Sequence, residues 1–143
     1  MDIRHLTDTY AVSPQITPQD VPALKAAGFS TIICNRPDAE IPADLQAARM
    51  RLAVEGQGMA FVNNPVISGA LTMDNVAAQG AAIAAAAGPV LAYCASGNRS
   101  SVVWALSQAG MQPTDALITA GARFGYQLEG LRAQIDAIAA KAR

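Results

Sequence analysis

The 143-residue sequence has few charged residues, few aromatic residues and almost no histidine or cysteine. Charged types make up 15% of it, the formal net charge is −1, and lysine and arginine form no run. Because a sequence-independent grip on nucleic acid or on an anionic membrane needs a basic patch, we exclude both as partners. The single histidine, His5, and the distant cysteines Cys34 and Cys94 give no close set of metal ligands, so we expect no metal site and no cofactor.

Long hydrophobic segments are missing as well. The longest apolar run, residues 81–87, is far shorter than the roughly 20 residues of a membrane-spanning helix. The first residues contain no apolar stretch of signal-peptide length. We therefore expect a soluble cytoplasmic protein, in which Cys34 and Cys94 are free thiols rather than a structural disulfide.

Hydrophobic types nevertheless make up 52% of the sequence, which is enough for a substantial core in a single domain spanning residues 1–143. Apolar segments rich in β-branched residues alternate with longer amphipathic segments, which is typical of an α/β domain with a mostly parallel sheet. The expected strands are 3–6, 10–13, 29–34, 59–62 and 90–93. The expected helices are 18–27, 42–55, 72–87, 101–109, 113–120 and 127–142. The pattern predicts a three-layer fold in which four or five strands are flanked by about six helices.

The most informative feature is the loop that follows the last expected strand, Cys94-Ala95-Ser96-Gly97-Asn98-Arg99-Ser100. A cysteine ends a buried strand, a short loop with glycine follows, and a helix begins at once. Backbone N–H groups in such a loop converge on one point, and the helix N-terminus adds partial positive charge there. Such a point binds an anion or stabilises a thiolate, so we predict that Cys94 is a nucleophile.

The side chains of this loop have predicted roles in holding an anion. Arg99 offers a planar fork of donors that suits an oxyanion. Ser100 can donate its hydroxyl to the sulfur or to the anion, and we group it with Cys94 and Arg99 as catalytic. The rest of the loop is expected to surround the anion, with Gly97 supplying backbone freedom; these residues are Ala95, Ser96, Gly97 and Asn98.

Two residues outside the loop are further candidates. Arg36 follows a parallel strand, at the edge where open α/β sheets place their sites, so we predict that it adds positive charge to the anion site. Cys34 ends the same strand. We expect it to be a packed thiol, with resolution of a persulfide or sulfenate on Cys94 as the alternative.

Four segments of the sequence resemble a known family; they are 3–7, 12–18, 32–38 and 93–100. Through them the sequence is similar to the phosphatase-like domain family of beta-lactamase-hydrolase-like proteins. The resemblance implies a dual-specificity-phosphatase-like fold. It also implies sulfur chemistry, because in some relatives the domain is fused to a persulfide dioxygenase and sulfurtransferase activity is associated with it. A persulfide-metabolising enzyme is therefore an expected partner.

The loop departs from related patterns at two places. Protein tyrosine phosphatases have Cys-X5-Arg, usually after a histidine, whereas here four residues separate Cys94 from Arg99 and Tyr93 comes before the cysteine. The family and the rhodaneses often carry arginine directly after the cysteine, where this sequence has Ala95. One positive charge of the expected anion site is therefore missing.

The shorter loop bears on the choice between phosphoryl transfer and sulfur transfer. A phosphoryl group needs a wide cradle, and six-residue loops resemble those of rhodaneses, which hold one persulfide sulfur. A phosphatase also protonates its leaving group, normally through an aspartate on a neighbouring loop. The matching segment, residues 64–69, has no carboxylate; Asp74 is explained by the start of a helix, and Asp38 is a remoter candidate.

These arguments rank three functions. Sulfur transfer through a Cys94 persulfide, with a small anionic or thiol substrate, comes first. A phosphatase of the tyrosine or dual-specificity type, acting through a Cys94 phosphoenzyme, is the alternative. A non-catalytic module that binds an anion or a persulfide is the third.

Overall fold

The computed structural model describes residues 1–142 and contains one five-stranded sheet. The order of the strands across the sheet is β1-β2-β5-β3-β4. Only the pairing of β1 with β2 is antiparallel, and the other three pairings are parallel. The strands are β1 (Arg4–His5), β2 (Tyr10–Ser13), β3 (Thr31–Cys34), β4 (Ala60–Asn63) and β5 (Val90–Tyr93).

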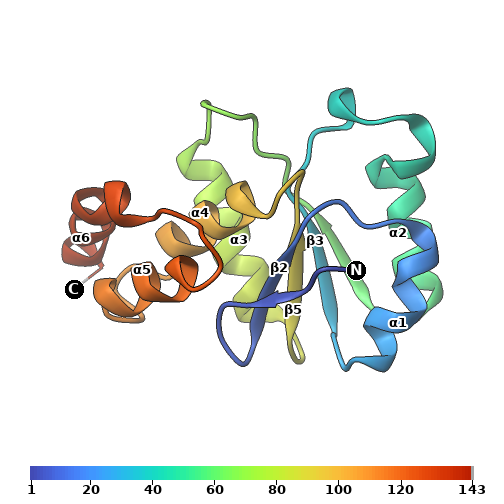
Figure 1. The fold of residues 1–143 in the computed structure, drawn as a ribbon, viewed down its shortest axis with the longest axis horizontal. Helices are drawn as coiled ribbons and strands as arrows, with labels where there is room; N and C mark the ends of the chain where they lie inside the picture. Colours follow the sequence, from blue (N-terminus) through green and yellow to red (C-terminus); the bar gives the residue numbers. More distant parts are fainter. Residues whose placement is uncertain (143) are drawn as a thin grey trace.

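Helices cover both faces of the sheet (Figure 1). One face carries α1 (Val21–Ala26) and α2 (Ala47–Gly56), and the other carries α3 (Met73–Ala85) and α4 (Asn98–Ser107). The last two helices, α5 (Thr114–Ala122) and α6 (Arg132–Lys141), lie outside α4 on that second side (Figure 1). The predicted three-layer α/β fold with a mostly parallel sheet is confirmed. Among residues 1–142, no helix is both long and apolar enough to cross a membrane.

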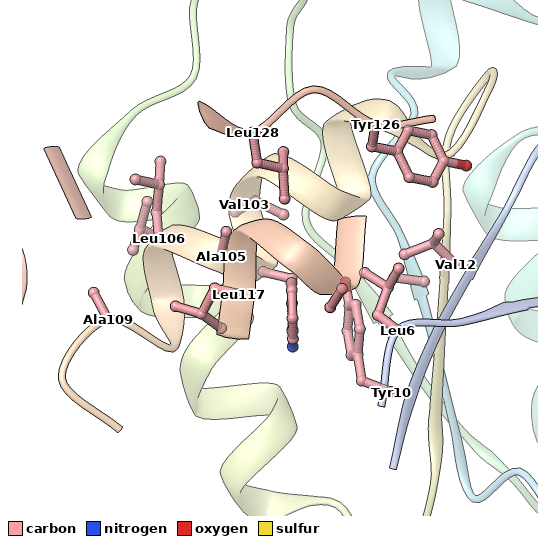
Figure 2. Close-up of a cluster of buried hydrophobic side chains, with 14 of the residues drawn as sticks. Leu6, Tyr10, Val12, Val103, Ala105, Leu106, Ala109, Leu117, Tyr126 and Leu128 are labelled. Carbon is pink, nitrogen blue, oxygen red and sulfur yellow. The ribbon is translucent and has the colours of Figure 1, made fainter. Parts of the chain in front are cut away.

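Each layer boundary has its own hydrophobic core. Met50, Val54 and Leu91 belong to the cluster between the sheet and α1 and α2. The second cluster, on the side of α3 and α4, includes Trp104 and Leu117, and Figure 2 shows its residues around α4 and α5. Strands β2, β3 and β5 are buried along their whole length, as expected of parallel strands covered on both faces.

The register of the sheet brings the ends of its strands together. Cys34 on β3 pairs with Tyr93 on β5 and with Asn63 on β4, and Ser13 on β2 pairs with the same Tyr93. Four parallel strands therefore end level, and the residues that follow them meet at one edge of the sheet. The loop that begins at Cys94 leaves from the middle of this edge.

Four expected helix starts were wrong by three residues or more. The helix expected from residue 18 begins at Val21, after a 3-10 turn over Pro18–Asp20. The helix expected from residue 42 begins at Ala47, after a 3-10 turn over Ala43–Leu45, because the Asp38 carboxylate accepts a hydrogen bond from the Ala47 N–H (2.9 Å) and fixes the start there. The helix expected from residue 101 begins at Asn98, because Gly97 at φ +92° turns the chain into it directly. The last helix begins at Arg132 rather than 127, after a 3-10 turn over Glu129–Leu131.

Candidate functional site

The Cys94 thiol lies where β5 turns into the loop. Cys94 is fully buried, and its Sγ accepts a hydrogen bond from the Gly97 N–H at 3.1 Å. The Cys94 N–H in turn donates to the Ser13 carbonyl at the end of β2 (3.4 Å). The strand and the loop therefore hold the sulfur from both sides, and a backbone donor already points at it.

The start of α4 offers further donors to an anion. Within residues 1–142 the backbone N–H groups of Ser96, Arg99 and Ser100 donate to no protein atom, while the Asn98 N–H donates to the Ser96 hydroxyl (3.3 Å). Orphan donors of this kind, together with the helix dipole, are what helix N-termini use to bind anions. The structure thus has the strand, the turn and the helix N-terminus expected around Cys94, and anion binding by this loop stays a prediction.

Arg99 lies beside Cys94 and is held by a carboxylate. Its Nη1 and Nη2 donate to the two carboxylate oxygens of Glu40, both at 2.8 Å, and Nη1 also donates to the Val66 carbonyl (2.8 Å). The hydrogen bonds to Glu40 raise the pKa of the Arg99 guanidinium, burial opposes this, and the neighbouring Cys94 raises it further. These bonds use three of the five guanidinium N–H groups, so the Nε–H and one Nη2–H of Arg99 are left for an anion.

Glu40 connects Arg99 with Arg36. The Arg36 Nε–H donates to the same carboxylate at 3.2 Å, and its Nη1 donates to the Gln15 side chain (3.4 Å). Hydrogen bonding to Arg99 is the largest cause that lowers the pKa of Glu40, so this carboxyl group is ionised at neutral pH. The structure brings Arg36 to the site through Glu40, a residue that the sequence analysis missed and that no local pattern marks.

The Ser100 hydroxyl is turned away from the sulfur. It donates to the Asn35 side-chain oxygen at 2.8 Å, so the expectation that it donates to Cys94 or to the anion is corrected. Asn35 belongs to a buried amide network in which its side chain and that of Asn64 both donate to the Gln79 oxygen, each at 2.9 Å. Ser100 is therefore tied to the loops after β3 and β4 and to α3, which leaves only its backbone N–H available to an anion.

Cys34 is held apart from this chemistry. Its buried thiol donates to the Arg36 carbonyl at 3.4 Å, and burial raises the pKa of Cys34. The thiol also lies beside the buried Tyr93 hydroxyl, but the geometry forms no hydrogen bond there. A protonated, fully buried thiol fits the packed role predicted for it better than a resolving role.

The segment after β4 lies over the site, as its position in the sequence predicted. The Val66 carbonyl accepts from Arg99, yet the segment 64–69 supplies no carboxylate. The two aspartates considered as general acids have other roles. Asp38 caps α2 through Ala47, and Asp74 lies in the first turn of α3. Among residues 1–142, no group of three or more His, Cys, Asp and Glu side chains could hold a metal ion.

The fold defines a protein-tyrosine-phosphatase-like domain, and comparisons with known proteins support this class. A candidate phosphatase of known structure from Neisseria meningitidis Z2491 superposes with a TM-score of 0.80 at 33% identity, covering 96% of this chain and 99% of that one. The structure of PTPMT1 in complex with PI(5)P superposes with a TM-score of 0.77 over 99% of both chains, at 15% identity, which shows the shared fold alone.

Sequence comparison then gives the family. Residues 2–111 match the phosphatase-like domain of beta-lactamase hydrolase-like proteins, and the chain belongs to this family. A beta-lactamase hydrolase-like protein from Agrobacterium fabrum (strain C58) is 35% identical over 101 residues, which are 71% of this chain and 23% of that protein. The chain spans less than a third of the length of the curated relatives that it matches.

Proposed function

We propose that the domain hydrolyses phosphoric monoesters through a covalent Cys94 phosphoenzyme. The observation that carries the proposal is the Cys94 sulfur, which accepts the Gly97 N–H at the N-terminus of α4 with Arg99 beside it, inside a phosphatase-like fold. The Neisseria meningitidis relative, which shares both fold and a third of its residues, supports the same reaction class. These comparisons reverse the order in which the sequence alone ranked the two activities.

The proposed reaction has two displacements at phosphorus. The thiolate attacks, an S–P bond forms, and the ester P–O bond breaks, with the electron pair leaving on the alkoxide or phenolate. Because residues 64–69 offer no carboxylate, the leaving oxygen takes its proton from water. Water then attacks the phosphoenzyme, breaks the S–P bond, and releases inorganic phosphate and the thiolate. The free loop N–H groups and the Arg99 Nε–H stabilise the equatorial oxygens in both steps.

Sulfur transfer is the second candidate, favoured by the six-residue loop from Cys94 to Arg99. A single persulfide sulfur fits a narrower cradle than a phosphoryl group does. Its donors, such as thiosulfate, release sulfite as an anion and need no general acid. The absence of a carboxylate in residues 64–69 is therefore no obstacle to this reaction.

One experiment separates the candidates. The protein and its Cys94→Ser variant are assayed for hydrolysis of p-nitrophenyl phosphate and for transfer of sulfur from thiosulfate to cyanide, and intact mass is recorded after each donor. We expect the parent protein to hydrolyse p-nitrophenyl phosphate, because p-nitrophenolate leaves without an acid. Cys94→Ser should abolish this hydrolysis, because it removes the nucleophile. Sulfur transfer without hydrolysis, with one added sulfur on Cys94, would overturn the proposal in favour of the second candidate. If the protein shows neither activity, the proposal is also overturned, and the third candidate, a module that only binds an anion, is favoured.

A further inference from the structure

We propose that Tyr126, supported by Arg4, is a positioning residue that aims the loop backbone at the Cys94 sulfur. The inference rests on the proposed function in one respect, namely that Cys94 is the nucleophile. It does not depend on whether the sulfur attacks phosphorus or another sulfur atom. Tyr126 lies after α5, distant in sequence from the loop, and nothing in its local sequence marks it as part of the site.

The central observation is a single peptide unit, the one that joins Ser96 to Gly97. The Tyr126 hydroxyl donates to the Ser96 carbonyl at 2.8 Å, and the Gly97 N–H donates to Cys94 Sγ at 3.1 Å. In a trans peptide the C=O and the next N–H point in opposite directions. Holding the carbonyl on one side therefore directs the N–H to the sulfur on the other.

Arg4 fixes the direction of the tyrosine hydrogen bond. Its Nη1 donates to the Tyr126 hydroxyl oxygen at 2.7 Å, and its guanidinium lies 5.5 Å from the centre of the Tyr126 ring. Since a carbonyl cannot donate, the hydroxyl must accept from Arg4 and donate to Ser96. A hydroxyl that accepts from a cation is a stronger donor. The Arg4 Nε–H in turn donates to the Asp2 carboxylate (3.1 Å), which holds Arg4 in place.

Gly97 fits this arrangement in two ways. It adopts φ +92°, and a Cβ at this position would lie 2.1 Å from the Tyr126 hydroxyl oxygen. Any side chain at residue 97 would therefore displace the tyrosine from the loop. A glycine on one side also makes a peptide flip easy, and a flip would turn the Ser96 carbonyl toward the sulfur. The Tyr126 hydroxyl opposes that flip.

Packing and charge support the assignment. Tyr126 is 6% exposed, and Figure 2 shows its ring at the margin of the core, with the hydroxyl directed away from Leu128. Burial raises the pKa of Tyr126, Arg4 opposes this, and the nearby Cys94 raises it further. The hydroxyl is therefore protonated at neutral pH, as a donor to the Ser96 carbonyl must be.

The test is the pH profile of Cys94 alkylation by iodoacetamide, measured on the Cys94 peptide by mass spectrometry. Tyr126→Phe removes the hydroxyl and keeps the ring, so the N–H that stabilises the thiolate loses its support. We expect the midpoint of the profile to move upward by about one pH unit, the effect of one hydrogen bond to a charged group. Arg4→Gln should move it in the same direction by less, and Arg4→Lys should restore part of the difference.

Tyr93→Phe is the matched control. It removes another buried tyrosine hydroxyl, one that has no hydrogen-bond partner among residues 1–142. Tyr93 pairs with Cys34 in the sheet and lies outside the loop, so this variant should leave the midpoint unchanged. Cys34 is as buried as Cys94 and lies outside the loop, so its alkylation in the same samples shows how far general opening of the fold exposes a thiol. An unshifted midpoint in Tyr126→Phe, with Cys34 still protected, would overturn the inference. Because alkylation needs no substrate, this result is independent of whether p-nitrophenyl phosphate is hydrolysed.

Discussion

Cys34 is the last residue of β3, and Cys94 directly follows the neighbouring parallel strand β5. Their surroundings differ. A backbone N–H points at the sulfur of Cys94, whereas Cys34 donates to a carbonyl and burial raises its pKa. We expect Cys94→Ser to abolish turnover and Cys34→Ser to keep most of it. Steady-state rates of the two variants test this, and equal losses would instead indicate a mechanism that uses both thiols.

Glu40 sets the direction of the Arg99 guanidinium, so it should matter for rate although it touches no substrate. In Glu40→Gln one oxygen becomes an NH₂ group that repels the guanidinium, and the bidentate pair is lost. A displacement of about 1 Å at such a site costs on the order of 100-fold in rate, and we expect a loss in kcat/KM approaching that.

A matched control for Glu40 is available on α2. Glu55 pairs with Arg51 on the surface at 3.8 Å, so Glu55→Gln removes a similar charge without touching the site and should leave kcat/KM unchanged. If Glu40→Gln also kept full activity, the pair with Arg99 would be an ordinary surface contact. Because the pKa of Glu40 is lowered, its ion pair with Arg99 persists at neutral pH. The pair is lost only as the pH falls through that lowered pKa.

The residues of the site divide by how far apart they lie in the sequence. The strand, turn and helix start around Cys94 and Ser100 could be predicted because they depend on adjacent residues. Glu40 and Tyr126 could not, since each reaches the loop through a side chain from a distant segment. The predicted direction of the Ser100 hydroxyl was wrong for the same reason, because its partner Asn35 follows another strand.

At the scale of elements, a buried amide network joins the ends of β3 and β4 to α3. Gln79, on α3, accepts from Asn35 and Asn64 and donates to the Tyr10 hydroxyl (3.0 Å). Gln79 is a polar side chain at 0% exposure on this helix. The network holds Asn35 beside Ser100, so it connects the position of the anion loop to the packing of α3.

Gln79→Leu should destabilise the fold more than the change in side-chain size alone would. The substitution leaves the amides of Asn35 and Asn64 buried without this partner, and each such group costs about 1–3 kcal/mol. We expect the free energy of unfolding in urea to fall by about 2 kcal/mol or more. Gln134→Leu, on the exposed side of α6, is the control and should change it by less than about 0.5 kcal/mol. Equal effects would mean that the network adds no stability.

Over the whole molecule, the order of the elements was the part that sequence patterns predicted best. Buried strands such as β3 and β5 are short, mostly apolar runs, and their alternation with helices specifies the layers. The starts of α2 and α4 depend on a side-chain cap from Asp38 and on a left-handed glycine. Those are single-residue effects that an apolar pattern does not contain.

The whole fold should lose stability in alkali. Burial raises the pKa of Cys34, Tyr10 and Tyr93 above their ordinary values of 9.0 for the thiol and 10.0 for the phenols. A raised pKa means that the folded state holds the proton more tightly, so the stability is complete below these ordinary values and is lost as the pH rises through the folded ones. We expect the thermal midpoint to be steady near neutral pH and to fall above about pH 9.

Two tyrosine variants should change the stability of the fold in opposite directions at neutral pH. Tyr93→Phe removes a buried hydroxyl that has no hydrogen-bond partner in the part of the chain that the structure describes. The variant should therefore be more stable at pH 7, by about 1 kcal/mol, and should lose less in alkali. Tyr10→Phe also removes a titrating group, but its hydroxyl donates to the Ser100 carbonyl (2.8 Å), so it should be less stable at pH 7 by about 1 kcal/mol. Thermal unfolding of both from pH 7 to 11 measures the two effects. A Tyr93→Phe variant that melts below the parent at neutral pH, with the same alkaline slope, would contradict the prediction, because the hydroxyl would then be stabilising the core.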